Sequence, residues 1–139
     1  MSDMKYLSVA GTTAFYACHP HHRDRTPNKC KWTIPQPDEY NSFVNAYEND
    51  WIIDNRGWGL HPPSALPDYL GTSVDKLRRL FVACYVDGNS NDKWHGYPAD
   101  HVNNNSDRLP ESIKKMWLRD RVLSPAKIHK LAVGKPCSL

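Results

Sequence analysis

The segment of residues 17–32, ACHPHHRDRTPNKCKW, is rich in side chains that bind transition metals. It supplies five candidate ligands, which are Cys18, His19, His21, His22 and Cys30. Zinc is commonly held in a tetrahedral arrangement by four thiolates or imidazole nitrogens, so these residues could form a structural zinc site. However, no second pair of closely spaced ligands is present, and adjacent residues of a strand point to opposite faces. We favour a polar surface loop without metal over a zinc site.

The four cysteines leave a disulfide open as a further alternative. Cys18, Cys30, Cys84 and Cys137 could pair in three ways in an exported protein, whereas in a reducing compartment they should be thiols or metal ligands. The first residues, MSDMKYLSVAG, lack the pattern of a secretory signal, and no apolar run approaches the roughly 18 residues of a membrane span. We therefore expect a cytoplasmic protein with free thiols and no membrane association.

A second group of reactive side chains is His95, Asp100 and His101. A histidine beside a carboxylate can act as a general base or help to hold a divalent ion that activates water. The string ADHVNNN, which contains Asp100 and His101, resembles the start of the His-Asn-His nuclease motif. This resemblance implies a metal-dependent phosphodiesterase or nuclease in which His95 assists the other two residues.

The same region also fits a purely structural role. Trp94 and Tyr97 would pack against the core, and Gly96 would allow a turn. We favour this structural alternative.

The chain contains no glycine-rich dinucleotide or phosphate loop and no G-x-S-x-G element. We expect no cofactor, with zinc or another divalent metal as the alternative.

The charge of the chain is divided unevenly. Residues 108–139 carry eight Lys or Arg against two acids, a local balance of +6, while the rest carries ten basic and thirteen acidic residues, a balance of −3. Clustered cations attract polyanions and accelerate encounter with them. The candidate contact residues are Lys114, Lys115, Arg119, Arg121, Lys127 and Lys130. This pattern favours an acidic partner, either a nucleic acid or an acidic protein, and the alternative is a solvated face.

Local signals predict two short helices in this basic segment, a pair that spans about 108–134. Pro110 can stand in the first turn of a helix that ends near Arg121. Ser124 can cap a second helix that ends at Gly134. The pair resembles a helix-turn-helix, but its outward face offers Lys rather than the Asn, Gln and Arg that read base edges. Binding to nucleic acid should therefore be weakly specific and salt-dependent.

The first part of the chain should form a β unit followed by a helix. Short strands are expected over 5–10, 13–18 and 29–34, because these segments are rich in aromatic and β-branched residues and end at Gly or Pro. Asp38 could cap the helix that follows. Its apolar residues recur every three or four positions; they are Tyr40, Phe43, Val44, Tyr47 and Trp51.

The middle of the chain should supply the centre of the sheet. We expect a long loop over 54–71, packed down by side chains such as Leu66, and a short helix over 72–79. The run LFVACYV, residues 80–86, is typical of a buried strand, and 93–98 can return as its hairpin partner. The predicted protein is one compact α+β domain over residues 1–139, with a small, mainly antiparallel sheet, one central amphipathic helix and two short C-terminal helices. Its predicted role is that of a small binding or regulatory protein.

Overall fold

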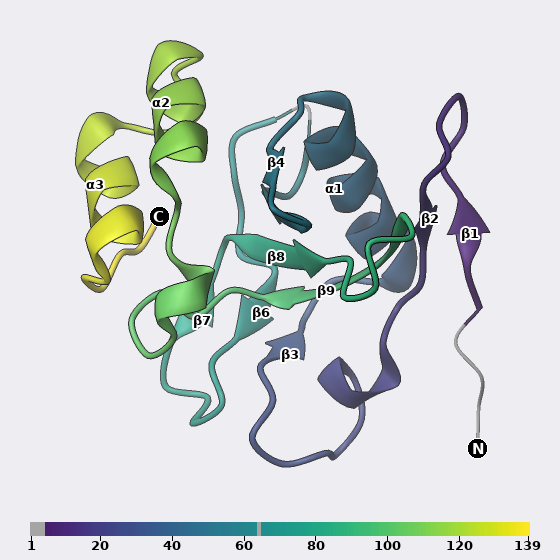
Figure 1. The fold of residues 1–139 in the computed structure, drawn as a ribbon. Coiled ribbons are helices and arrows are strands. Elements are labelled where there is room, and N and C mark those ends of the chain that lie inside the picture. Colours follow the sequence, from purple (N-terminus) through teal and green to yellow (C-terminus); the bar gives the residue numbers. More distant parts are fainter. Residues whose placement is uncertain (1–4, 64) are drawn as a thin grey trace.

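A computed structural model describes residues 5–63 and 65–139 (Figure 1). One set of strands comprises β1 (Leu7–Ser8), β2 (Phe15–Tyr16), β4 (Ile52–Ile53), β5 (Arg56–Gly59), β8 (Ala83–Val86) and β9 (Lys93–Pro98). A second set comprises β3 (Lys31–Trp32), β6 (Gly71–Thr72) and β7 (Arg79–Leu80). The helices are α1 (Gln36–Glu48), α2 (Glu111–Arg119) and α3 (Pro125–Val133), with short 3-10 turns η1 (Pro20–His22) and η2 (Asn105–Asp107). The predicted α+β class is confirmed, with one central helix and two C-terminal helices.

The strands form a six-stranded sheet in the order β1-β2-β9-β8-β5-β4 and a three-stranded sheet in the order β3-β6-β7. The hairpin of β8 and β9 occupies the middle of the larger sheet, as the sequence predicted. Most neighbours are antiparallel, but β2 runs parallel to β9. The N-terminal hairpin therefore joins the sheet through a strand that lies far away in the sequence.

Gly96 has a different role from the turn that we expected. It lies inside β9, directly opposite Tyr85 of β8. A Cβ atom at this position would lie 2.5 Å from Tyr85 Cδ1 and 2.8 Å from the carbonyl oxygen of Cys84. The missing side chain makes room for the buried Tyr85 ring in the centre of the sheet.

Helix α1 packs against β5 and buries one face. Phe43 on that face stacks on Tyr16 of β2, with ring centroids 4.7 Å apart. Two polar residues share this buried face, Glu39 and Ser42, and each is hydrogen-bonded to a tyrosine hydroxyl. The helix starts at Gln36, so the prediction that Asp38 caps it was wrong: a proline fits the first turn, and the helix begins before Asp38.

Two predictions for the middle of the chain were also wrong. Residues 73–78 form a turn instead of a helix, because the Ser73 hydroxyl donates to Asp75 and accepts from the backbone N–H of Arg78. The long loop predicted over 54–71 contains β5, a central strand with a buried tryptophan. Leu66, expected to pack down, is 89% exposed.

The two C-terminal helices lie side by side at the edge of the molecule opposite β1 (Figure 1). Ser124 caps α3 by accepting a hydrogen bond from the backbone N–H of Lys127, and Gly134 ends the helix with a positive φ of 83°. Both signals were predicted from the sequence. Helix α2 ends at Arg119, two residues earlier than expected, because Arg121 adopts a positive φ of 53°.

Candidate functional site

The first candidate group lies in the loop between β2 and β3, where the structure brings the histidines together. The ring centroid of His19 lies 4.8 Å from that of His21 and 5.8 Å from that of His22. His95, which comes from β9, joins them with its centroid 5.6 Å from that of His19. Parallel pairing of β2 with β9 explains this convergence, because it carries the segment after β2 past His95.

Hydrogen bonds from the loop itself fix two of these rings. The Nδ1 of His22 lies 2.9 Å from the carbonyl oxygen of Cys30, so its N–H donates there. The Nδ1 of His21 lies 2.9 Å from the Thr26 hydroxyl and 3.4 Å from Asp24 Oδ2. Burial and neighbouring positive charges lower the pKa of His22 to about 4. These contacts hold the loop in shape around the neutral imidazole of His22.

The two cysteines of the proposed zinc set face other neighbours. The Cys18 thiol lies 4.0 Å from the carbonyl oxygen of Gln36, and Cys30 is buried. Within residues 5–63 and 65–139, all four cysteines are free thiols, and no three His, Cys, Asp or Glu side chains are placed so that they could hold a metal ion. The zinc site is therefore not assembled in this arrangement and stays a prediction.

The second candidate group, His95, Asp100 and His101, has separate surroundings for each member. Asp100 accepts from Arg78 Nη2 at 2.6 Å and from Asn103 Nδ2 at 3.0 Å. Burial raises the pKa of its carboxyl, but these two donors outweigh that effect and hold the pKa below its ordinary value. The Nε2 of His101 lies 2.6 Å from the carbonyl oxygen of Lys135. The nuclease hypothesis gains no support from these contacts and stays a prediction.

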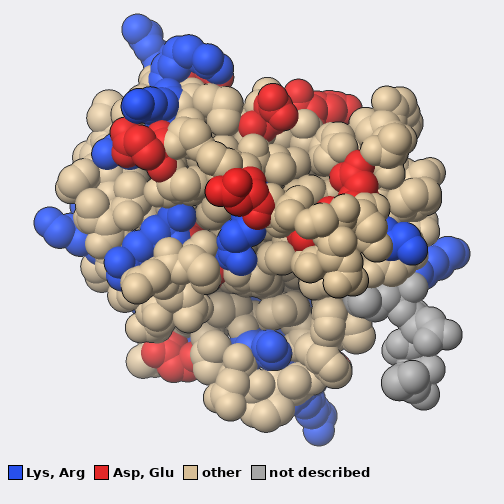
Figure 2. All heavy atoms as spheres, in the orientation of Figure 1, with Lys and Arg blue, Asp and Glu red and all other residues tan. Residues whose placement is uncertain are grey.

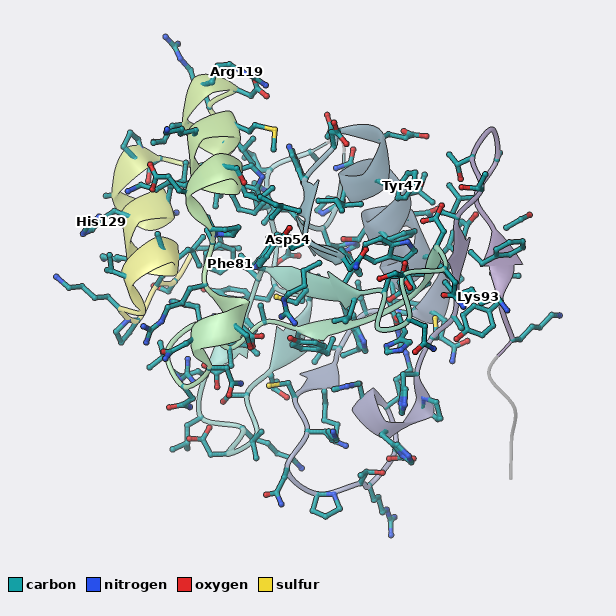
Figure 3. The ribbon with its side chains drawn as sticks, in the orientation of Figure 1. Tyr47, Asp54, Phe81, Lys93, Arg119 and His129 are labelled. Carbon is teal, nitrogen blue, oxygen red and sulfur yellow. The ribbon has the colours of Figure 1, made fainter. Side chains whose placement is uncertain are left out.

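The basic C-terminal pair presents most of its cations to solvent. Figure 2 shows Lys and Arg side chains along the side where Figure 1 places α2 and α3. Figure 3 labels Arg119 and His129, whose side chains project outward from these helices. On α2, Lys115 is exposed and Lys114 is half-buried, while Arg119 is paired with its neighbour Asp120 at 2.9 Å.

A cavity beside α3 extends this basic surface. Its volume is about 380 Å³, and it lies between α3, β7 and the C-terminal residues. We call it the basic hollow. Its charged and polar lining includes Arg78, Arg79, Lys127, Lys130, His101 and Tyr69. Phe81, labelled in Figure 3, also lines it.

The cations of the basic hollow differ in what they contact. Arg78 is occupied by Asp100. The guanidinium carbon of Arg79 lies 4.0 Å from the centroid of the Tyr69 ring, a cation–π contact. In the described part of the chain, no carboxylate lies within 4.0 Å of Arg79, Lys127 or Lys130. Three positive charges therefore surround the basic hollow without an internal counter-charge.

Sequence reasoning found two of these three cations and missed Arg79. The sequence predicted Arg78 and Arg79 at the end of a helix over 72–79, and this helix does not form. In the structure β7 carries Arg79 to the side of Lys127 and Lys130. The available signal was the adjacent pair of arginines just before the apolar run of residues 80–86, since Arg is well suited to contacts with anions.

Comparisons with protein-family models, with curated proteins and with solved structures give no match for this chain. Within the residues described, no helix has the length and apolar character required to cross a membrane.

Proposed function

We propose that this protein binds nucleic acid through its basic C-terminal pair and the basic hollow beside it. The observation that carries the proposal is the set of three cations, Arg79, Lys127 and Lys130, around one cavity without a carboxylate partner among the described residues. A phosphate group supplies the missing negative charge and several hydrogen-bond acceptors at once.

The distribution of cations favours a nucleic acid over an acidic protein. Lys115 and Arg121, on and just after α2, are exposed and add to the positive charge of the C-terminal pair. A nucleic acid backbone offers regularly repeated charges to such a surface, and Arg is well suited to bidentate phosphate contacts. Because the cations of α3, Lys127 and Lys130, are both lysines, we expect binding with little sequence preference.

The test measures binding of a short fluorescein-labelled oligonucleotide by fluorescence anisotropy. Three phosphate contacts on a duplex, one for each of Arg79, Lys127 and Lys130, predict a fall in affinity of about fortyfold between about 50 and about 200 mM NaCl. The double substitution Lys127→Gln/Lys130→Gln should weaken binding and reduce the slope of log affinity against log salt by about two.

A matched control removes the same charge elsewhere. Arg25 and Lys29 are exposed in the loop before β3, so Arg25→Gln/Lys29→Gln should leave the affinity within about twofold of wild type. Equal losses in both double variants would overturn the assignment of the surface. If poly-glutamate binds as tightly as the oligonucleotide and depends on the same lysines, the partner is an acidic protein and the nucleic acid proposal fails.

A further inference from the structure

A second and larger cavity, of about 690 Å³, lies on another part of the molecule and shares no lining residue with the basic hollow. It is bounded by β1, β2, η1 and the first turns of α1, at the side of Figure 1 where β1 is labelled. Its apolar walls come from Leu7, Tyr16, Pro20, Pro37 and Tyr40. We call it the tyrosine cavity. Its size lies within the range of sites that bind small molecules.

The polar groups behind the tyrosine cavity are held rigidly. Glu39 is fully buried and accepts from the Tyr16 hydroxyl at 2.5 Å and from Nε and Nη2 of Arg23 at 3.2 and 2.8 Å. Arg23 Nη1 also donates to the carbonyl oxygen of Ile34 at 2.8 Å. Tyr16 and Arg23, which line the cavity, are therefore held in place by Glu39 before any ligand arrives. Groups that are preorganised in this way bind a ligand at lower entropic cost.

Two cations of the cavity lining, Arg23 and Lys5, offer unused hydrogen-bond donors. A guanidinium has five N–H donors, and Arg23 uses three of them in the contacts described above. Lys5 also lines the cavity, and no carboxylate of the described residues lies within 4.0 Å of its ammonium group.

Two carboxylates lie at this cavity: Glu39 is buried behind it, and Asp24, which is half-exposed, is part of its lining. Glu39 is occupied by Tyr16 and Arg23. The Thr26 hydroxyl and backbone N–H donate to Asp24 and hold the pKa of its carboxyl at about 2, with a further contribution from His21. A ligand that enters this cavity therefore meets apolar walls and spare donors, and it gains most by bringing an acceptor of its own.

We propose that the tyrosine cavity binds a small amphipathic anion, a molecule with an apolar body and a single carboxylate or sulfonate group. The apolar body packs between Tyr16, Tyr40 and the two prolines. The anionic group lies toward Lys5 and Arg23. The Cys18 thiol also lines the cavity, and because burial raises its pKa to about 12, it acts as apolar wall and not as a nucleophile.

The test uses 2-naphthoate and its uncharged analogue 2-naphthamide in isothermal titration calorimetry. We expect one molecule of 2-naphthoate to bind per chain, and 2-naphthamide to bind at least about tenfold more weakly, which corresponds to about 1.4 kcal/mol. Absence of saturable 2-naphthoate binding up to about 1 mM, or equal affinity for both compounds, would overturn the proposal.

Two variants locate the binding site. Asn41 is exposed and lines the tyrosine cavity from α1, so Asn41→Trp should fill part of it and weaken 2-naphthoate binding at least about tenfold. Glu48→Trp places the same side chain at the exposed end of α1 and should leave binding unchanged. Circular dichroism and thermal unfolding of both variants establish that they fold. Equal binding by a folded Asn41→Trp variant would place the ligand elsewhere and reject this cavity.

Discussion

Arg23 and Lys130 are both cations in basic stretches of the sequence, yet they lie in opposite surroundings. Arg23 lines the tyrosine cavity and is paired with the fully buried Glu39, whose Oε1 lies 2.8 Å from Arg23 Nη2. Lys130 lies exposed on α3, without a carboxylate within 4.0 Å in the described part of the chain. The comparison shows that a cation in a basic stretch can be paired with an internal carboxylate or left unpaired, and that only the tertiary structure decides which.

The largest effect should come from breaking the buried pair. Glu39→Ala leaves the Arg23 guanidinium and the Tyr16 hydroxyl without their shared acceptor, so we expect the free energy of unfolding to fall by about 3–5 kcal/mol. Urea denaturation followed by circular dichroism measures this loss. The control is Asp120→Ala, which removes an exposed partner of Arg119 and should cost at most about 1 kcal/mol. Similar losses in the two variants would remove the distinction between buried and exposed pairs.

A smaller effect should distinguish the tightly packed centre of the sheet from its exposed turns. Gly96→Ala adds a Cβ atom 2.5 Å from Tyr85 Cδ1, and such overpacking costs about 1–3 kcal/mol. Gly88→Ala is the matched control, because its added Cβ atom meets nothing within 4 Å; its change should stay within about 0.5 kcal/mol. Equal urea midpoints for the two variants would contradict the packing described around Tyr85.

The histidines of the β2–β3 loop should make stability depend on pH. The pKa of His22 is about 4 in the folded protein because of burial, against an ordinary value of 6.5, and burial also lowers the pKa of His19 and of His95. As the pH falls below 6.5 the unfolded chain takes up protons first, so the contribution of His22 to the free energy of unfolding decreases down to about pH 4 and is constant below that.

His22→Gln should remove part of that pH dependence. With allowance for solvent screening, we expect the wild type to lose about 1–2 kcal/mol more than this variant between pH 7 and pH 4. Urea unfolding at a series of pH values measures the difference. The control His129→Gln changes an exposed ring on α3, outside the loop, and should follow the wild-type curve. Parallel curves for wild type and His22→Gln would show that this ring does not couple folding to protons.

Features that depend only on residues close together in the sequence could be predicted from it. The cap at Ser124 and the helix end at Gly134 need only a hydroxyl and a residue that tolerates positive φ at the correct spacing. The β8–β9 hairpin follows from two apolar segments joined by a polar turn. The failed helix over 72–79 shows the limit of such reasoning, because the Ser73 hydroxyl closes a turn that competes with the helix.

The amino-acid sequence by itself determined the α+β class, the central hairpin and the basic character of the C-terminal pair, since these depend on local pattern and composition. Tertiary structure alone decided which basic side chains have a carboxylate partner and which distant residues meet. It brought Tyr69 against Arg79, placed Glu39 against Arg23, and carried His95 to His19 through the parallel pairing of β2 with β9. Each of these contacts joins residues from separate segments of the chain, and their formation depends on how the whole core packs, which no short window of sequence contains.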